Sequence, residues 1–267
     1  MIDCHNHLQD EAFADHLEEI VDELRNLGVC HWGVNGTSEE DWERVAILAD
    51  RYPEVTPFFG LHPWKCEQRS ADWFSKLRDY LEQFPDAGLG EVGLDKWIRN
   101  VDFGEQDLVF RKQMEVALEL KRPLLVHCLQ AWGIMKERIE EYDCGGSVLL
   151  HSYGGPLEMV SGFEKLGACF SISGYFFKPE KSKKLKPFLE VAPDRLLVET
   201  DAPDMSLPES LRRFRVETLE SGNEVNHPAN ISAVYQAVAE LRGIAVNDLQ
   251  IQAEANWNEW LARGRTC

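Results

Sequence analysis

The chain opens with Met1-Ile2-Asp3-Cys4-His5-Asn6-His7, in which one residue separates two histidines. Side chains two positions apart on a β-strand project from the same face. His5 and His7 therefore form a ready pair of imidazole ligands on a first strand. A lone histidine pair near a chain terminus can also be a surface feature, so the rest of the sequence must supply its partners.

Short β-rich runs alternate with amphipathic helical stretches along the chain. We expect eight strands, at residues 1–7, 29–35, 55–60, 87–92, 123–128, 147–151, 168–173 and 195–200. An apolar stripe at helical spacing follows the first of them and ends at a glycine: Phe13, Leu17, Ile20, Leu24, Leu27 and then Gly28. Ser38, with Asp41 three residues later, is expected to cap a second helix.

Eight such units predict an α/β fold, a (β/α)8 TIM barrel of the metal-dependent hydrolase type, which usually spans about 250 residues. A doubly wound sheet is the competing architecture, but no glycine-rich dinucleotide fingerprint follows the first strand. No linker or low-complexity tract divides the 267 residues, and 44% of them are apolar. We therefore expect one barrel domain, residues 1–267, with C-terminal helices.

The cysteines and the hydropathy pattern indicate the compartment. Seven cysteines, an odd number that never forms CxxC, suit free thiols in a reducing cytosol. No run of 18 apolar residues occurs, and no basic segment leads into an apolar one. We expect a cytoplasmic protein that does not associate with membranes.

More metal-binding side chains stand where the later strands meet turns: Glu91, His127, His151 and Asp201. The carboxyl ends of the strands are where barrels of this kind build active sites. Ligand-type residues on five strands at one rim predict a single metal centre that joins these residues to the histidine pair. His62 lies near a loop, and the pattern alone leaves its role open.

Ordered motifs resemble the TatD-type metal-dependent deoxyribonucleases of the amidohydrolase-like barrels over nearly the whole chain. Residues 3–7 are similar to the family's DxHxH, residues 60–63 (GLHP) to its GxHP, and residues 90–95 (GEVGLD) to its GEIGLD. Further matches are PLLVHC at 123–128, HSYGG at 151–155, ETDAP at 199–203, NHPAN at 226–230 and AELRG at 239–243.

The resemblance implies two divalent ions that share Glu91, with one ion on His5, His7 and Asp201 and the other on His127 and His151. Imidazole and carboxylate ligands suit zinc, manganese, iron or nickel better than calcium, and magnesium also fits at low affinity. Asp201 is then the expected catalytic base. Glu199 is expected either to hydrogen-bond a ligand imidazole from behind or to pair with a buried cation.

The family's chemistry implies a DNA or other phosphodiester substrate. A net charge of −18 repels long duplexes, so we expect DNA ends or single strands. A lysine cluster after the seventh strand, with Lys183 and Lys184 at its centre, is either a phosphate contact or a solvated face.

Aromatic side chains follow several strands on the same rim: Trp64, Trp97, Trp132 and Tyr153. They are expected either to stack on unpaired bases or to pack beneath the loops. Among them we assign Trp64 and Tyr153, together with His62, to substrate binding.

Three departures from the family pattern bear on the substrate. Leu129 stands where most members carry an arginine, and Tyr153 and Gly154 replace a phenylalanine and a serine in the strand-6 motif. His227 replaces a glutamate, and the stretch before it, residues 208–224, is longer and more polar than usual. The loss of a guanidinium weakens phosphate recognition. Two alternatives therefore stay open: hydrolysis of a small ester, lactone or amide by the same metals, and a non-catalytic binding role in a larger system.

Overall fold

A computed structural model describes residues 1–216 and 225–266. Its centre is a sheet of eight strands in chain order, each parallel to the next. The strands are β1 (Ile2–Asn6), β2 (His31–Asn35), β3 (Val55–Phe59), β4 (Gly88–Asp95), β5 (Leu124–Leu129), β6 (Val148–Leu150), β7 (Cys169–Ser173) and β8 (Leu196–Glu199). Backbone bonds from Asp201 N–H to the His5 carbonyl (3.0 Å) and from His7 N–H to the Ala202 carbonyl (2.7 Å) join the two ends of the sheet.

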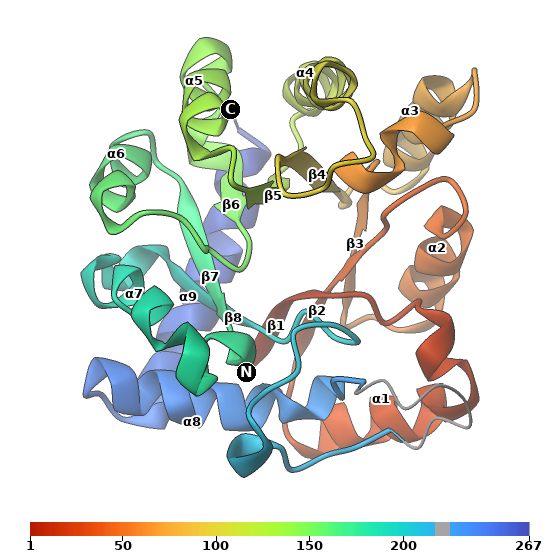
Figure 1. Cartoon of the computed structure of the whole chain (residues 1–267). Coiled ribbons are helices and arrows are strands. Elements are labelled where there is room, and N and C mark those ends of the chain that lie inside the picture. The colour runs from red at the N-terminus through yellow and green to blue at the C-terminus, as the bar shows by residue number, and fades with distance from the viewer. Residues whose placement is uncertain (217–224, 267) are drawn as a thin grey trace.

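Helices surround this sheet on the outside (Figure 1). They are α1 (Leu17–Asn26), α2 (Trp42–Arg51), α3 (Trp73–Gln83), α4 (Phe103–Leu120), α5 (Trp132–Tyr142), α6 (Val160–Lys165), α7 (Pro187–Glu190), α8 (Ile231–Arg242) and α9 (Val246–Gly264). The predicted (β/α)8 barrel is confirmed. No helix within residues 1–216 and 225–266 is long and apolar enough to cross a membrane.

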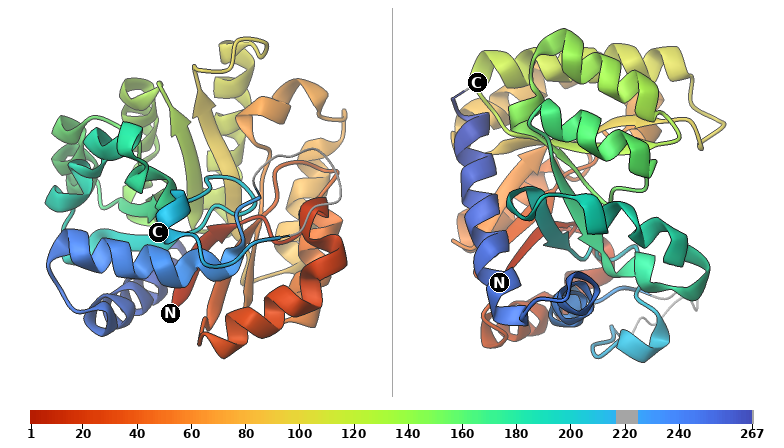
Figure 2. Two further views of the ribbon diagram at one scale, coloured as in Figure 1. Left: turned by 60° about the horizontal axis from the view of Figure 1, so that its bottom comes forward. Right: turned by 90° about the vertical axis from the view of Figure 1, so that its left-hand side faces the viewer.

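The last helix, α9, lies across the amino-terminal end of the barrel and covers it (Figure 2). Trp260 stacks on Phe58 of β3 with ring centroids 5.8 Å apart, and Trp257 lies beside both. The Trp260 indole N–H donates to the Ser147 carbonyl at the start of β6. These apolar contacts close the floor of the barrel, so only the carboxyl ends of the strands open toward solvent.

The expected cap of the second helix is wrong in detail. The helix begins at Trp42, and Asp41 rather than Ser38 directly precedes it. The Asp41 carboxylate accepts the backbone N–H groups of Thr37 and Ser38, at 2.9 and 3.1 Å. The carboxylate thus reaches back to hold the turn after β2, because two free N–H groups there lack other partners.

Candidate metal centre

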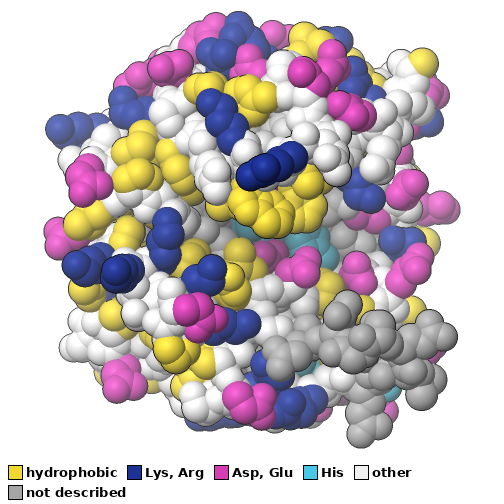
Figure 3. Space-filling view, viewed as in Figure 1, with side chains coloured by type: hydrophobic (Ala, Val, Ile, Leu, Met, Phe, Trp, Pro, Cys, Tyr) yellow, Lys and Arg dark blue, Asp and Glu magenta, His cyan; other side chains and the backbone are white. Residues whose placement is uncertain are grey.

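The six predicted ligand side chains come together at the carboxyl end of the barrel. His5 lies on β1, Glu91 on β4 and His127 on β5, while the others follow directly after strands: His7, His151 and Asp201. Their donor atoms fall into three overlapping groups in which all atoms lie within 4.8 Å of one another: His5 with His151 and Asp201, His5 with His7 and Glu91, and Glu91 with His127 and His62, a residue outside the predicted six. Figure 3 shows histidine side chains at the bottom of a hollow in this face.

Glu91 is the centre of the group. Its Oε2 atom lies 3.6 Å from His5 Nε2 and 3.4 Å from His7 Nε2. Its Oε1 atom lies 3.1 Å from His127 Nδ1 and 3.0 Å from His151 Nε2. The two oxygens of one carboxylate therefore face two different pairs of imidazoles.

Asp201 completes the first of these pairs. Its Oδ1 atom lies 3.0 Å from His5 Nε2 and 3.5 Å from His7 Nε2. The residue has a φ of 54°, in the left-handed region that side-chain-bearing residues rarely adopt. Its backbone N–H donates to the His5 carbonyl, so β1 fixes this unusual conformation. Such strain held by neighbouring structure is typical of functional sites.

Acceptors behind two of the imidazoles determine which ring nitrogen carries the proton. His7 Nδ1 lies 2.7 Å from the Asn35 carbonyl, and His127 Nε2 lies 3.1 Å from Asp95 Oδ2. Carbonyls and carboxylates accept hydrogen bonds, so these outer nitrogens hold the protons and the lone pairs turn toward Glu91. His151 Nδ1 lies 3.5 Å from Glu199 Oε1, an ion-pair distance without hydrogen-bond geometry.

The donor set fits a cation rather than a hydrogen-bond network. Lone pairs on several imidazoles converge on carboxylates that themselves offer only lone pairs. Nitrogen and carboxylate oxygen donors in this arrangement suit transition-metal ions, and thioether or thiolate ligands are not part of it.

Without a cation at the centre, a proton on His7 Nε2 takes its place, and the pKa values follow from this exchange. Burial acts to lower the pKa of His7, but hydrogen bonds to Asp201 and Glu91 outweigh it and raise the pKa well above its usual value. Burial acts to raise the pKa of Glu91, but the neighbouring His151 holds it well below its usual range. Glu91 therefore stays ionised, as a carboxylate that holds a metal must.

Asp95 also belongs to the site, although its place in the GEVGLD motif did not by itself predict a role for it. Its Oδ2 atom accepts from His127 and, at 2.6 Å, from the indole N–H of Trp64. Its Oδ1 atom accepts the backbone N–H of Trp97 at 2.7 Å. Because alternate residues on a strand share a face, its position four residues after Glu91 on β4 is the signal that could have revealed it.

Within the described ranges, no Lys or Arg side chain pairs with Glu199. Its Oε2 atom accepts from the Ser171 hydroxyl, while its Oε1 atom faces His151. Of the two roles considered for Glu199, this geometry matches a contact behind an imidazole.

His62 also reaches the centre, with its Nε2 atom 3.4 Å from Glu91 Oε1. Its Nδ1 atom accepts the backbone N–H of Trp64 at the start of a 3-10 helix over Pro63–Gln68. Burial lowers the pKa of His62, so the ring is neutral near pH 7 and carries its proton on Nε2. His62 therefore presents an N–H donor to the site, whereas His7 and His127 present lone pairs.

The proposed substrate-contact residues divide into two kinds. Trp64 is 41% exposed on the rim. Lys183 and Lys184 are exposed, and the Lys184 ammonium donates to the Gly154 carbonyl, three residues after His151. The prediction that Tyr153 binds substrate is wrong, because its side chain is fully buried and cannot stack on a base.

The burial of Tyr153 has a clear cause. Its ring packs edge-on against Trp132 of α5 and Phe170 of β7, and its hydroxyl donates to the Pro156 carbonyl. Trp132 is only 8% exposed for the same reason. An aromatic side chain that follows a strand end can turn outward under a helix as easily as inward to the site.

The departures from the family motifs lie in different places. Leu129 is the last residue of β5, on the same strand face as His127, so a side chain there points toward the centre. His227 lies elsewhere, with Nε2 3.1 Å from Glu23 on α1.

A family model described as TatD related DNase matches residues 2–262. The Escherichia coli protein described as an uncharacterized metal-dependent hydrolase, YjjV, is 27% identical over 243 residues, 90% of each chain. The 3'-5' ssDNA/RNA exonuclease TatD of Pantoea vagans is 28% identical over 261 residues, 96% of this chain and 97% of the relative. The crystal structure of E. coli YjjV superposes with a TM-score of 0.88 at 25% identity and covers 97% of both chains.

Proposed function

Because the chain belongs to the TatD-related DNase family and is a metal-dependent hydrolase, we propose that it is a phosphodiesterase that hydrolyses DNA ends or single strands. The observation that carries the proposal is the position of Glu91, with each carboxylate oxygen facing a separate pair of imidazoles. A carboxylate in that position can bridge two ions.

We assign two divalent ions to the centre, one held by His5, His7 and Asp201 and one by His127 and His151, with Glu91 shared. Zinc, manganese, magnesium, iron and nickel are the candidates that these donors admit. When bound, the ions supply Lewis acids for the phosphoryl oxygens and acidify a water molecule.

The protein's own groups then handle the proton and the phosphate. Asp201 is the base, because its carboxylate lies among the ligand side chains, 3.0 Å from His5 Nε2, and can accept a proton there. His62 donates its Nε2–H to a phosphate oxygen, which binds the substrate and orients it. Asp95 and Glu199 hold the imidazoles of His127 and His151 in place from behind.

Three observations support a nucleic-acid end as the substrate. Related proteins carry the name 3'-5' ssDNA/RNA exonuclease. The rim that surrounds the centre carries exposed cations, including Lys183 and Lys184. The overall charge of −18 disfavours long duplexes, whose binding depends on many phosphate contacts. We assign the activity to the cytoplasm, since Cys4, Cys30, Cys66, Cys128 and Cys169 are free thiols.

One observation favours a second candidate, a hydrolase of small esters or lactones. Leu129 faces the centre from the end of β5 and brings an apolar side chain where an arginine would bind phosphate. An uncharged substrate would tolerate this replacement better than a phosphodiester.

The deciding experiment loads the metal-free protein separately with each of the five metals. Each form is then given a single-stranded oligonucleotide, the same strand as a duplex, bis(p-nitrophenyl) phosphate and a lactone. We expect the single strand to shorten from an end, faster than the duplex, and the phosphodiester to be hydrolysed. Lactone opening without any phosphodiester cleavage would replace the proposal with the second candidate.

A further inference from the structure

We propose that the hollow between Trp97, Arg99 and Gln130, beside the metal centre, binds one nucleotide of a single strand, with its base on the Trp97 indole and its phosphate on the Arg99 guanidinium. This inference rests on the proposed function and names the part of the strand that the protein recognises. The hollow has a volume of about 510 Å³ and is lined by Lys96, Trp97, Ile98, Arg99 and Gln130. Pockets that bind small ligands have volumes of roughly 300–1,000 Å³.

The aromatic wall of the hollow is exposed although the ring is large. Trp97 is 56% exposed, whereas Trp132 on the same rim is 8% exposed and packs in the core. The Trp97 and Trp64 rings lie 6.3 Å apart with 33° between their planes, and Trp64 lies 6.3 Å from the His127 ring. Two indoles thus lead outward from the metal centre, and the outer one leaves a face free to stack on a base.

Arg99 supplies an unpaired positive charge. Across residues 1–216 and 225–266, every other arginine forms an ion pair or a side-chain hydrogen bond, and Arg99 forms neither. In a chain with 46 acidic and 28 basic residues, a guanidinium without an acidic partner is unusual. A guanidinium held free beside an aromatic ring suits a phosphate oxygen.

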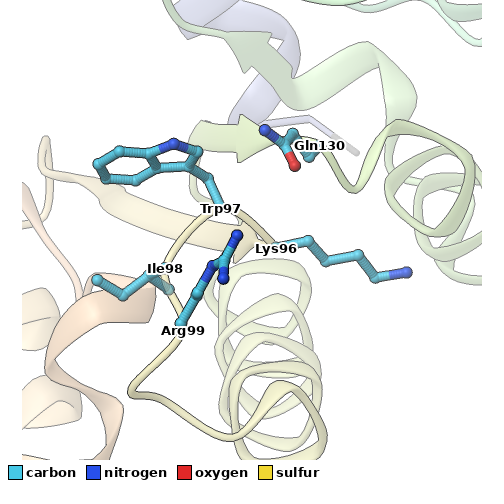
Figure 4. A pocket seen from close by; sticks show the side chains of 5 residues that line it. All are labelled: Lys96, Trp97, Ile98, Arg99 and Gln130. Carbon is cyan, nitrogen blue, oxygen red and sulfur yellow. The ribbon is translucent and has the colours of Figure 1, made fainter.

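The arrangement in Figure 4 separates the roles of the two cations. The Arg99 side chain rises toward the space between Trp97 and Gln130, while Lys96 extends away to the side. The Lys96 ammonium lies over the Phe103 ring, 4.6 Å from its centroid. Arg99 is therefore the phosphate contact, and Lys96 contributes its charge at a distance.

Asp95 fixes the hollow relative to the metal centre. One carboxylate accepts from His127 in the centre, from the Trp64 indole and from the backbone N–H groups of Trp97 and Ile98. A base that stacks on Trp97 is thus held at a constant offset from the scissile phosphate. A paired base cannot offer its face in this way, so the hollow selects unpaired nucleotides.

The test measures binding, independently of turnover, with the metal-loaded Asp201→Asn protein. The probes are a fluorescein-labelled decathymidylate and a decamer of the same backbone without bases, titrated by fluorescence anisotropy. We expect Trp97→Ala to weaken binding of decathymidylate about 10-fold or more, from the loss of base stacking. Binding of the abasic decamer should change by less than about 2-fold, because it has nothing to stack.

Arg99→Gln should weaken both decamers equally and reduce the slope of log Kd against log salt by about 0.7, as one lost phosphate contact does on a single strand. Trp97→Tyr should restore decathymidylate binding, because a tyrosine ring still stacks. The matched control is Arg265→Gln, which removes the same charge at the amino end of the barrel, where Arg265 contacts Asp86. It should leave both titrations unchanged.

An equal loss for both decamers in Trp97→Ala, or no loss for either, overturns the proposal. The outcome is distinct from that of the proposed function. If the wild type cleaves DNA but Trp97→Ala has no effect on binding, the nucleotide site in the hollow is rejected and the proposed nuclease activity stands. If decathymidylate binds through Trp97 but no metal form of the wild type cleaves DNA, the nucleotide site is supported and the proposed nuclease activity is rejected.

Discussion

Asp95 Oδ2 lies 3.1 Å from His127 Nε2, so a carboxylate on β4 fixes the proton of an imidazole on β5 and turns its lone pair inward. Asp95→Asn replaces one acceptor oxygen by an amide N–H2 group. That group only donates hydrogen bonds, so the side chain loses acceptors for the N–H groups of His127, Trp64 and the backbone. We expect the affinity for the bound metal to fall by about 10- to 100-fold, as usually follows loss of such a partner. Metal titration by calorimetry measures it, with Asp86→Asn at the amino end as the control.

Asp201→Asn separates metal binding from catalysis. The amide keeps an oxygen that can hold an ion but cannot accept a proton as a base. We expect turnover to fall by about 100-fold or more while part of the metal remains bound. His5→Ala should instead lower both turnover and bound metal, because Nε2 is lost altogether. Metal content by mass spectrometry and kcat on bis(p-nitrophenyl) phosphate distinguish the two variants, and full activity of metal-free Asp201→Asn protein would sink this mechanism.

Removal of the metal should destabilise the fold, because ions bound only by the native state add to its stability. At a free metal concentration of about 100 times Kd, the free energy of unfolding includes about 2.7 kcal/mol from binding. For a chain of this length that corresponds to a fall in Tm of roughly 5–10 °C on chelation. Scanning calorimetry with and without EDTA measures it. The Glu91→Gln protein is the control. It binds less metal, so EDTA should lower its Tm by less.

The barrel could be predicted because its strands are buried runs separated by amphipathic helices, a pattern that depends on local sequence alone. All eight expected strands overlap those in the structure, with ends that differ by up to three residues. The positions of His5 and His7 follow from the two-residue period of a strand. These features need no knowledge of what lies opposite each residue.

The direction of side chains beyond the strand ends could not be predicted, because it depends on contacts between distant segments. Tyr153 turns under α5 and α6, since a pocket formed by Trp132, Phe163 and Phe170 accepts its ring. His62 turns inward because its Nδ1 caps a 3-10 helix. Each of the two residues lies three positions after the end of a strand, and only tertiary packing decides which way its side chain turns.

Gly93 lies on β4 midway between Glu91 and Asp95, and the neighbouring backbone of β5 leaves no room for a side chain there. Its φ is 150°, and an added Cβ would lie 1.8 Å from the His127 carbonyl oxygen. Gly93→Ala should therefore lower the free energy of unfolding by roughly 3 kcal/mol. Gly133→Ala is the matched control, because Gly133 lies in α5 with nothing within 4 Å of the new Cβ. It should change stability by less than about 1 kcal/mol, in the stabilising direction. Urea unfolding compares them, and equal effects would contradict the steric argument.

Leu129→Arg tests whether the missing guanidinium limits the nuclease. β5 continues to Leu129, so this half-buried position shares its strand face with His127 and an arginine there can reach the substrate phosphate. A new charge-assisted contact should stabilise the transition state on a single-stranded oligonucleotide by about 1–3 kcal/mol, seen as higher kcat/KM. Ile251→Arg adds the same charge on α9, where Ile251 is 62% exposed, and should have no such effect. If Leu129→Arg leaves DNA cleavage unchanged while the wild type opens a lactone efficiently, Leu129 is the floor of a pocket for an uncharged ester.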